Sequence, residues 1–161
     1  MTFKITKIQV NNFRNLNHDV INLSPFINCL FGKNGNGKTN VLEALYVLGT
    51  KKSFRKNAHF SQYLSLDSEG FEISFNSLLK DQKNNNHSFT GKLSQEDSWW
   101  YWNQDLVKKR PLLKMVFINP FDSYAFHNQA SFRRKWFDNH ISLMDKSYKS
   151  SLGRYNIALR N

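Results

Sequence analysis

The sequence contains a single cysteine, Cys29, which excludes an intramolecular disulfide framework. It also lacks an apolar run long enough to cross a membrane and an N-terminal segment that looks like a signal peptide. Its five histidines show none of the spacings that metal-ligand sets use. We therefore expect a cytoplasmic protein with no membrane partner, in which Cys29 is a core thiol. At 161 residues it is one domain or part of one.

Acidic residues are scarce relative to basic ones. The chain has 23 lysines and arginines against 12 aspartates and glutamates, which gives a formal net charge of +11. From Leu106 onward, eleven basic residues face three acidic ones, a net +8. An excess of this sign favours an anionic partner, most often nucleic acid.

One glycine-rich stretch fits a known phosphate-binding pattern at every fixed position. Residues Gly32–Thr39 read G-K-N-G-N-G-K-T, which matches G-x-x-x-x-G-K-[ST]. In such a loop the glycines bring backbone N–H groups close to a phosphate chain. Lys38 would reach the β- and γ-phosphates, and the Thr39 hydroxyl would hold Mg²⁺. The sequence therefore predicts a nucleotide-binding loop; the alternative is a glycine-rich turn that binds nothing.

The flanks of the loop strengthen this prediction. Phe26–Phe31 is a mostly apolar run that is typical of a buried strand. Apolar residues then recur at helical spacing from Val41 to Leu48, and Gly49 is expected to end that helix. Strand, loop and helix in this order direct a helix N-terminus at an anion.

Periodicity elsewhere predicts further strands and then helices. Strands are expected at Phe3–Val10 (with a slip of register), Val20–Leu23, Phe71–Leu79, Ser88–Leu93 and, as a buried strand, Leu112–Ile118. The third and fourth of these are expected to pair antiparallel. A short helix is expected around Ser123–Phe126 and helical structure from Ser131 onward. The aromatic run Trp99–Trp102 is expected to pack on both faces of a sheet, with stacking on exposed bases as the alternative.

Hydrolysis of a nucleotide needs more than a phosphate loop. A carboxylate at the end of a neighbouring apolar strand holds the Mg²⁺ shell and orients water. The run Leu112–Ile118 ends in Asn119, and Phe71–Leu79 offers only Asp81, after Lys80. The sequence thus supports a nucleotide-binding half-site and no catalytic residue.

Several collinear motifs together resemble the RecF family of DNA replication and repair proteins. The family patterns are F-R-N, G-x-N-G-x-G-K-T-N-x-L-E-A, S-F-R, P-E-D, R-R-x-F-L-D and Y-x-x-x-L-x-x-R-N. The corresponding segments here are Phe13-Arg14-Asn15, Gly32–Ala44, Ser53-Phe54-Arg55, Asn119-Pro120 with Asp122, Arg133-Arg134 with Asp138, and Tyr155–Asn161. The resemblance covers the whole chain.

The resemblance implies an α/β fold of the P-loop NTPase class. We expect an ABC/SMC-like head lobe with a mixed β-sheet around the phosphate-loop helix, followed by C-terminal helices that begin an arm. Residues 1–129 would form the ATP-binding lobe and 130–161 the start of the arm.

The resemblance also implies ligands, partners and site residues. Such proteins bind ATP and Mg²⁺, form head-to-head dimers with nucleotide between them, and bind single-stranded or gapped DNA. They act with other recombination mediators in repair and the SOS response. Carried onto this sequence, the nucleotide contacts are Gly32, Lys33, Asn34, Gly35, Asn36, Gly37, Lys38, Thr39, Asn40, Arg14 and Arg55, with Thr39 on Mg²⁺. The basic residues Arg133, Arg134 and Lys135 are candidates for contacts to the DNA backbone.

The chain departs from the family pattern in two ways. Family members continue into a helical arm, a signature motif and an acidic strand, so we expect this chain to be an N-terminal, truncated part. Within the matched part, Phe121 stands where the family has glutamate, Asn128 stands for a glycine, and Lys51-Lys52 stands for Gly-Arg.

Two other functions stay open from the sequence. The first is a DNA-binding or structural fragment that has lost nucleotide binding. The second is a small P-loop kinase complete in one chain, which would need an acceptor site and an acidic strand that we do not find.

Overall fold

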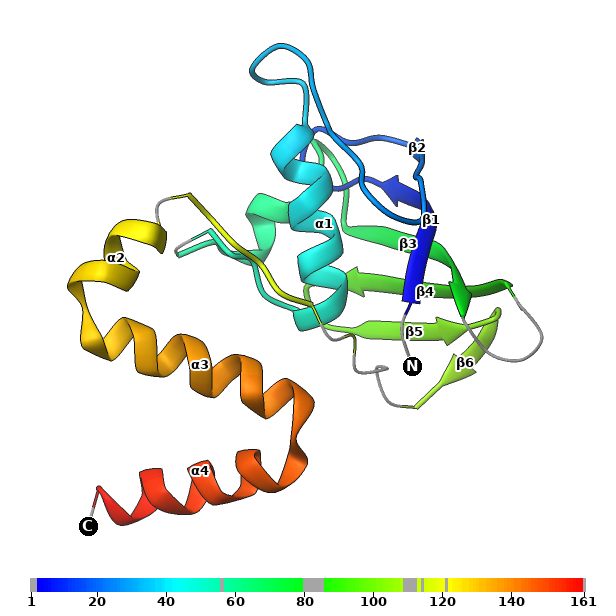
Figure 1. Cartoon of the computed structure of the whole chain (residues 1–161). Helices are drawn as coiled ribbons and strands as arrows, with labels where there is room; N and C mark the ends of the chain where they lie inside the picture. Colours follow the sequence, from blue (N-terminus) through cyan, green and yellow to red (C-terminus); the bar gives the residue numbers. More distant parts are fainter. Residues whose placement is uncertain are drawn as a thin grey trace. The chain divides into compact units, whose positions relative to one another are not determined.

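A computed structural model of the protein describes residues 3–55, 57–79, 86–108, 113, 115–120 and 122–160. The chain forms two compact units, Met1–Leu112 and Leu113–Asn161. The first holds a β-sheet and helix α1, and the second holds helices α2 to α4 (Figure 1). The expected functional division at residue 129 stays a prediction.

The first unit is built on a six-stranded sheet in which every described pair of neighbours is antiparallel. The strand order is β2-β1-β3-β4-β5-β6. The bounds are β1 Phe3–Asn11, β2 Asp19–Asn22, β3 Gly70–Leu79, β4 Asn86–Ser94, β5 Ser98–Trp102 and β6 Asp105–Val107. The predicted strands in these regions and the β3–β4 hairpin are confirmed, as is the slip in β1, where the register shifts between Ile5 and Lys7.

One face of the sheet is packed against helix α1, Lys38–Thr50 (Figure 1). Alternate strand residues supply this buried face, as expected for period-two strands with one solvated side. Its members are Ile8, Val10, Phe71, Ile73, Phe75, Phe89 and Trp100 from the sheet, with Val41, Ala44, Val47 and Leu48 from α1. A Cβ on Gly91 would lie 2.7 Å from Leu48 Cδ1 and 2.6 Å from the Trp100 ring, so glycine lets helix and sheet approach closely.

The aromatic run in β5 alternates between the two faces. Trp100 is 4% exposed on the helix side, whereas its neighbour Trp99 is 43% exposed. The run therefore lies on both faces of the sheet, with Trp100 packed on the helix side and Trp99 exposed on the other.

Two predicted buried strands are wrong. The segment Phe26–Phe31 has no strand in the structure; Phe31 is 93% exposed and Cys29 is also exposed, so Cys29 is not a core thiol. The described residues of 112–118 likewise form no strand, and Ile118 is 74% exposed, while residues 112 and 114 lie outside the described part. An apolar run becomes a buried strand only beside partner strands, and the described sheet provides none for these two segments.

Helix α1 also ends later than predicted. Gly49 is buried inside the helix, which continues to Thr50. Lys51 takes the left-handed conformation at φ 60° and donates its N–H to Val47 O at 2.7 Å. Lys51 therefore takes the left-handed conformation after the last turn of the helix, where the sequence predicted a glycine.

The second unit consists of α2 Asp122–Asn128, α3 Ala130–Met144 and α4 Lys146–Ala158, which confirms the predicted helical region. Asp145 separates the last two helices because its carboxylate accepts from the N–H groups of Ser147 and Tyr148 as the N-cap of α4. The hydrogen bond from the Ser147 side chain, followed by those from the backbone of Tyr148 and Ser147, holds the pKa of Asp145 below its ordinary value. The Tyr148 hydroxyl donates to Asp138 Oδ1 at 2.5 Å and so joins α4 to α3. Among the described helices, none combines the length and the apolar character that a membrane crossing requires.

Candidate functional site

The predicted phosphate loop leads directly into the N-terminus of α1. Its three glycines have positive φ angles, 147° at Gly32, 90° at Gly35 and 80° at Gly37. Gly37 is the N-cap residue and provides no side-chain bond to the first turn. The first bond within the helix runs from Val41 N–H to Gly37 O at 3.0 Å, so the N–H groups of the preceding residues face the loop end of the helix. That end is electrostatically favourable for an anion.

Of the three loop glycines, Gly37 is the most closely packed. A Cβ on Gly37 would lie 2.9 Å from Leu16 Cδ2 and 3.1 Å from Asn15 Oδ1. By contrast, a Cβ on Gly35 would meet no heavy atom within 4 Å. The loop is thus held against the turn after β1 at one end and stands in open space in the middle.

Lys38 and Thr39 occupy the positions that phosphate chemistry requires. Lys38 Nζ lies across the loop and donates to Gly32 O and Lys33 O, both at 2.8 Å. Thr39 is exposed in the first turn of α1. An ammonium group over the loop and an accessible hydroxyl at the helix N-terminus are the donor set expected for a phosphate chain and its Mg²⁺.

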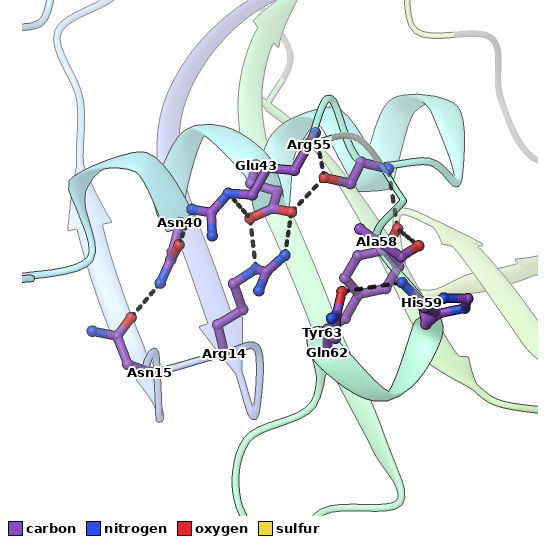
Figure 2. A network of polar contacts seen from close by, with 10 residues as sticks. Arg14, Asn15, Asn40, Glu43, Arg55, Ala58, His59, Gln62 and Tyr63 are labelled. Atoms are coloured by element: carbon purple, nitrogen blue, oxygen red, sulfur yellow. Dashed lines mark hydrogen bonds and ion pairs between the residues drawn. The ribbon is translucent and has the colours of Figure 1, made fainter.

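A buried carboxylate next to the loop gathers both predicted arginines. Glu43 is 0% exposed, on the inner side of α1. Arg14 contacts both carboxylate oxygens, through Nε at 2.6 Å and through a terminal nitrogen at 2.7 Å (Figure 2). Arg55 Nε lies 3.2 Å from the same carboxylate, and Ser53 Oγ donates to it at 2.5 Å. One negative charge therefore faces two positive ones, which leaves a net positive charge beside the phosphate loop.

Amide side chains link this cluster to the loop itself. Arg55 donates to Asn40 Oδ1 at 2.5 Å, and Asn40 Nδ2 donates to Asn15 Oδ1 at 2.6 Å (Figure 2). Asn15 Nδ2 in turn donates to Gly35 O at 3.1 Å. A chain of hydrogen bonds thus connects the segment after α1 to the middle of the loop.

The structure brings together the predicted nucleotide-contact residues. The loop residues, Asn40, Arg14 and Arg55 lie in one region of the first unit. Sequence reasoning missed Glu43, Asn15 and Ser53 as members of this network. The signal for Glu43 was present, because an acid on the buried face of an amphipathic helix needs a charged partner.

The predicted DNA-contact residues lie in the second unit, on α3. Arg133 donates to Phe126 O at 2.8 Å and His127 O at 3.0 Å, so it satisfies carbonyls at the end of α2. Arg134 and Lys135 are exposed. Of the two departures from the family pattern in this region, Asn128 ends α2 and donates to Tyr124 O, while Phe121 lies outside the described residues.

Comparisons with known proteins agree with this arrangement. Residues 3–151 match the family model described as AAA ATPase domain. The chain is 32% identical over 157 residues to the DNA replication and repair protein RecF of Azobacteroides pseudotrichonymphae, covering 95% of this chain and 42% of that protein. It is 30% identical over 159 residues to the RecF of Chlamydia abortus, covering 96% and 42%.

Solved structures give the same result for the fold. The chain matches the structure of the recombination mediator protein RecF-ATP in the RecFOR pathway with a TM-score of 0.73 at 27% identity. The RecF-ATPrS structure matches with a TM-score of 0.74 at 26% identity. Both matches cover 99% of this chain and 43% of the other chain. The fold is that of the P-loop NTPase head of RecF, and the chain spans less than half the length of these relatives.

The two loop glycines with left-handed angles should respond differently to a methyl group. Gly35→Ala adds only the backbone cost, on the order of 1–2 kcal/mol. Gly37→Ala adds a clash with Leu16 and Asn15, about 1–3 kcal/mol more. Thermal unfolding of both variants should therefore show a lower midpoint for Gly37→Ala. Equal midpoints would contradict the packing of the loop against the turn after β1.

Proposed function

The chain belongs to the AAA ATPase domain family, and we propose that it is the ATP-binding part of a RecF-type DNA replication and repair protein. The observation that carries the proposal is the formed phosphate loop at the N-terminus of α1, with Lys38 Nζ held over it. The likeness to the RecF-ATP structure supports ATP as the nucleotide.

In the proposed complex the loop residues Gly32–Asn40 hold the phosphates of ATP. Lys38, which donates to two loop carbonyls, would instead donate to phosphate oxygens, and the helix N-terminus would add backbone N–H donors. The Thr39 hydroxyl would hold Mg²⁺, and the ion would screen the phosphate charge. Mg²⁺ commonly takes few protein ligands beside phosphates and water, so the one hydroxyl fits.

Hydrolysis is proposed to need residues outside this chain. The carboxylate on α1, Glu43, is engaged by Arg14, Arg55 and Ser53. The proposed role of this chain is therefore nucleotide binding.

The remaining roles are proposed from the resemblance to the RecF family. They are binding of single-stranded or gapped DNA, nucleotide-dependent dimerisation of complete heads, action with other recombination mediators, the SOS response and a cytoplasmic location. The net charge of +11 supports an anionic partner. On α3, the exposed Arg134 and Lys135 are better candidates for DNA contacts than Arg133, which satisfies carbonyls of α2.

Calorimetric titration with MgATP tests the nucleotide site. Lys38→Ala removes the ammonium group that faces the phosphates, so the dissociation constant should rise by at least about tenfold. Lys92→Ala is the matched control, because Lys92 lies on β4 and pairs with Glu72 at 3.0 Å, outside the loop network. This control should bind MgATP like the wild type.

If the folded wild type does not bind MgATP, the nucleotide proposal fails for this chain. Salt-dependent DNA binding that MgATP leaves unchanged would then favour the DNA-binding fragment. Equal losses in Lys38→Ala and Lys92→Ala would place any binding outside the loop.

Fluorescence anisotropy with a labelled single-stranded oligonucleotide tests the DNA contacts. The double variant Arg134→Ala/Lys135→Ala removes two cations, so the slope of log affinity against log salt should become shallower by about 1.4. The double variant Lys7→Ala/Lys92→Ala removes the same charge from the sheet unit and should change the slope less. The reverse order would place the DNA contacts on the sheet unit.

A further inference from the structure

Asn15 is the residue that holds the middle of the phosphate loop. Its Nδ2 donates to Gly35 O at 3.1 Å, and its Oδ1 lies 3.1 Å from the position of a Cβ on Gly37. No heavy atom packs around the Cβ position of Gly35, so packing does not fix the loop there. The hydrogen bond from Asn15 supplies that restraint.

The hydrogen bond to the Gly35 carbonyl also orients the backbone N–H of the next residue, Asn36. In a trans peptide the carbonyl and the following N–H point to opposite sides. The bond to Asn15 therefore fixes the direction of the Asn36 N–H. That N–H makes a long bond, 3.4 Å, to Lys33 O.

The turn that carries Asn15 is itself anchored on both sides. Phe13 is fully buried and packs on the Phe71 ring at 5.1 Å between centroids. Arg14 donates its backbone N–H to Tyr63 O at 2.7 Å, and its carbonyl accepts from Ser65 Oγ at 2.7 Å. The three consecutive residues thus have separate contacts: Phe13 with the core, Arg14 with Glu43, and Asn15 with the loop.

Glu43 fixes Asn15 by two routes. One runs through Arg14, the neighbour of Asn15 in the turn. The other runs through Arg55 and Asn40, whose Nδ2 donates to Asn15 Oδ1 at 2.6 Å (Figure 2). Each amide in the second route accepts at its oxygen and donates from its nitrogen, an order in which successive hydrogen bonds polarise one another.

We propose that Asn15 is a positioning residue for the triphosphate of a bound nucleoside triphosphate, oriented by Glu43 through Arg14, Arg55 and Asn40. It acts through Gly35, whose carbonyl accepts from Asn15 Nδ2, while Asn15 Oδ1 accepts from Asn40. The inference rests on the proposed nucleotide binding. In this proposal the Phe13–Asn15 turn holds the loop in its binding conformation before the nucleotide arrives, and Glu43 anchors that turn.

The test combines MgATP calorimetry with thermal unfolding measured without nucleotide. Asn15 is exposed, so Asn15→Ala should leave the unfolding midpoint within about 2 °C of the wild type. Loss of the restraint on Gly35 should still raise the MgATP dissociation constant by about 5–10-fold. Asn22→Ala, which alters an exposed asparagine on β2, is the matched control and should change neither quantity.

Coupling between the residues is tested with Glu43→Gln, which keeps the shape of the side chain and removes its charge. The double variant Asn15→Ala/Glu43→Gln should weaken MgATP binding by less than the product of the two single effects, because both act on one network. If Glu43→Gln does not fold, Asn40→Ala replaces it in the same cycle.

The outcomes separate the two proposals. If the wild type binds MgATP, Lys38→Ala loses binding, and Asn15→Ala binds like Asn22→Ala, the positioning role is overturned while the nucleotide site stands. Strictly multiplicative effects in the double variant would overturn the role of Glu43. If the wild type does not bind MgATP, the proposed function fails and this inference fails with it.

Discussion

The buried carboxylate of Glu43 is the interaction on which the candidate site depends. Removing a carboxylate from water is costly unless charged partners and hydrogen bonds surround it, and here Arg14, Arg55 and Ser53 all contact it. These partners come from the turn after β1 and from the segment after α1. Glu43, on the inner side of α1, therefore connects these two segments to the helix, in addition to the apolar packing of α1 on the sheet.

Each of the two units carries exposed apolar residues outside its helices and strands. Phe26 and Ile27 are 78% and 83% exposed just before the phosphate loop, and in the second unit Val116 is 62% exposed. The chain spans 42–43% of the relatives it matches. The sheet and the network around Glu43 form among the described residues, whereas Ile27 and Val116 keep more than half of their surface exposed.

The sequence predicted well what depends on local pattern. The phosphate loop, helix α1, strands β1 to β4 and the helical C-terminal region follow from spacing, glycine positions and periodicity. The buried strands expected at Phe26–Phe31 and Leu112–Ile118 failed because burial depends on distant partners that an apolar run does not reveal. The family resemblance predicted a mixed sheet, and the strand pairs among the described residues are antiparallel. The link from Asn15 to Gly35 was not predictable, since it requires knowing which turn meets the loop.

The measurement that tests the account most directly is an amide chemical-shift map of the folded chain titrated with MgATP. The account predicts that the largest shifts fall on residues Gly32–Asn40, with further shifts at Asn15 and Arg55 because the side chains of Asn40 and Asn15 connect them to the loop. Shifts that saturate elsewhere in the chain, with the loop amides unchanged, would contradict it.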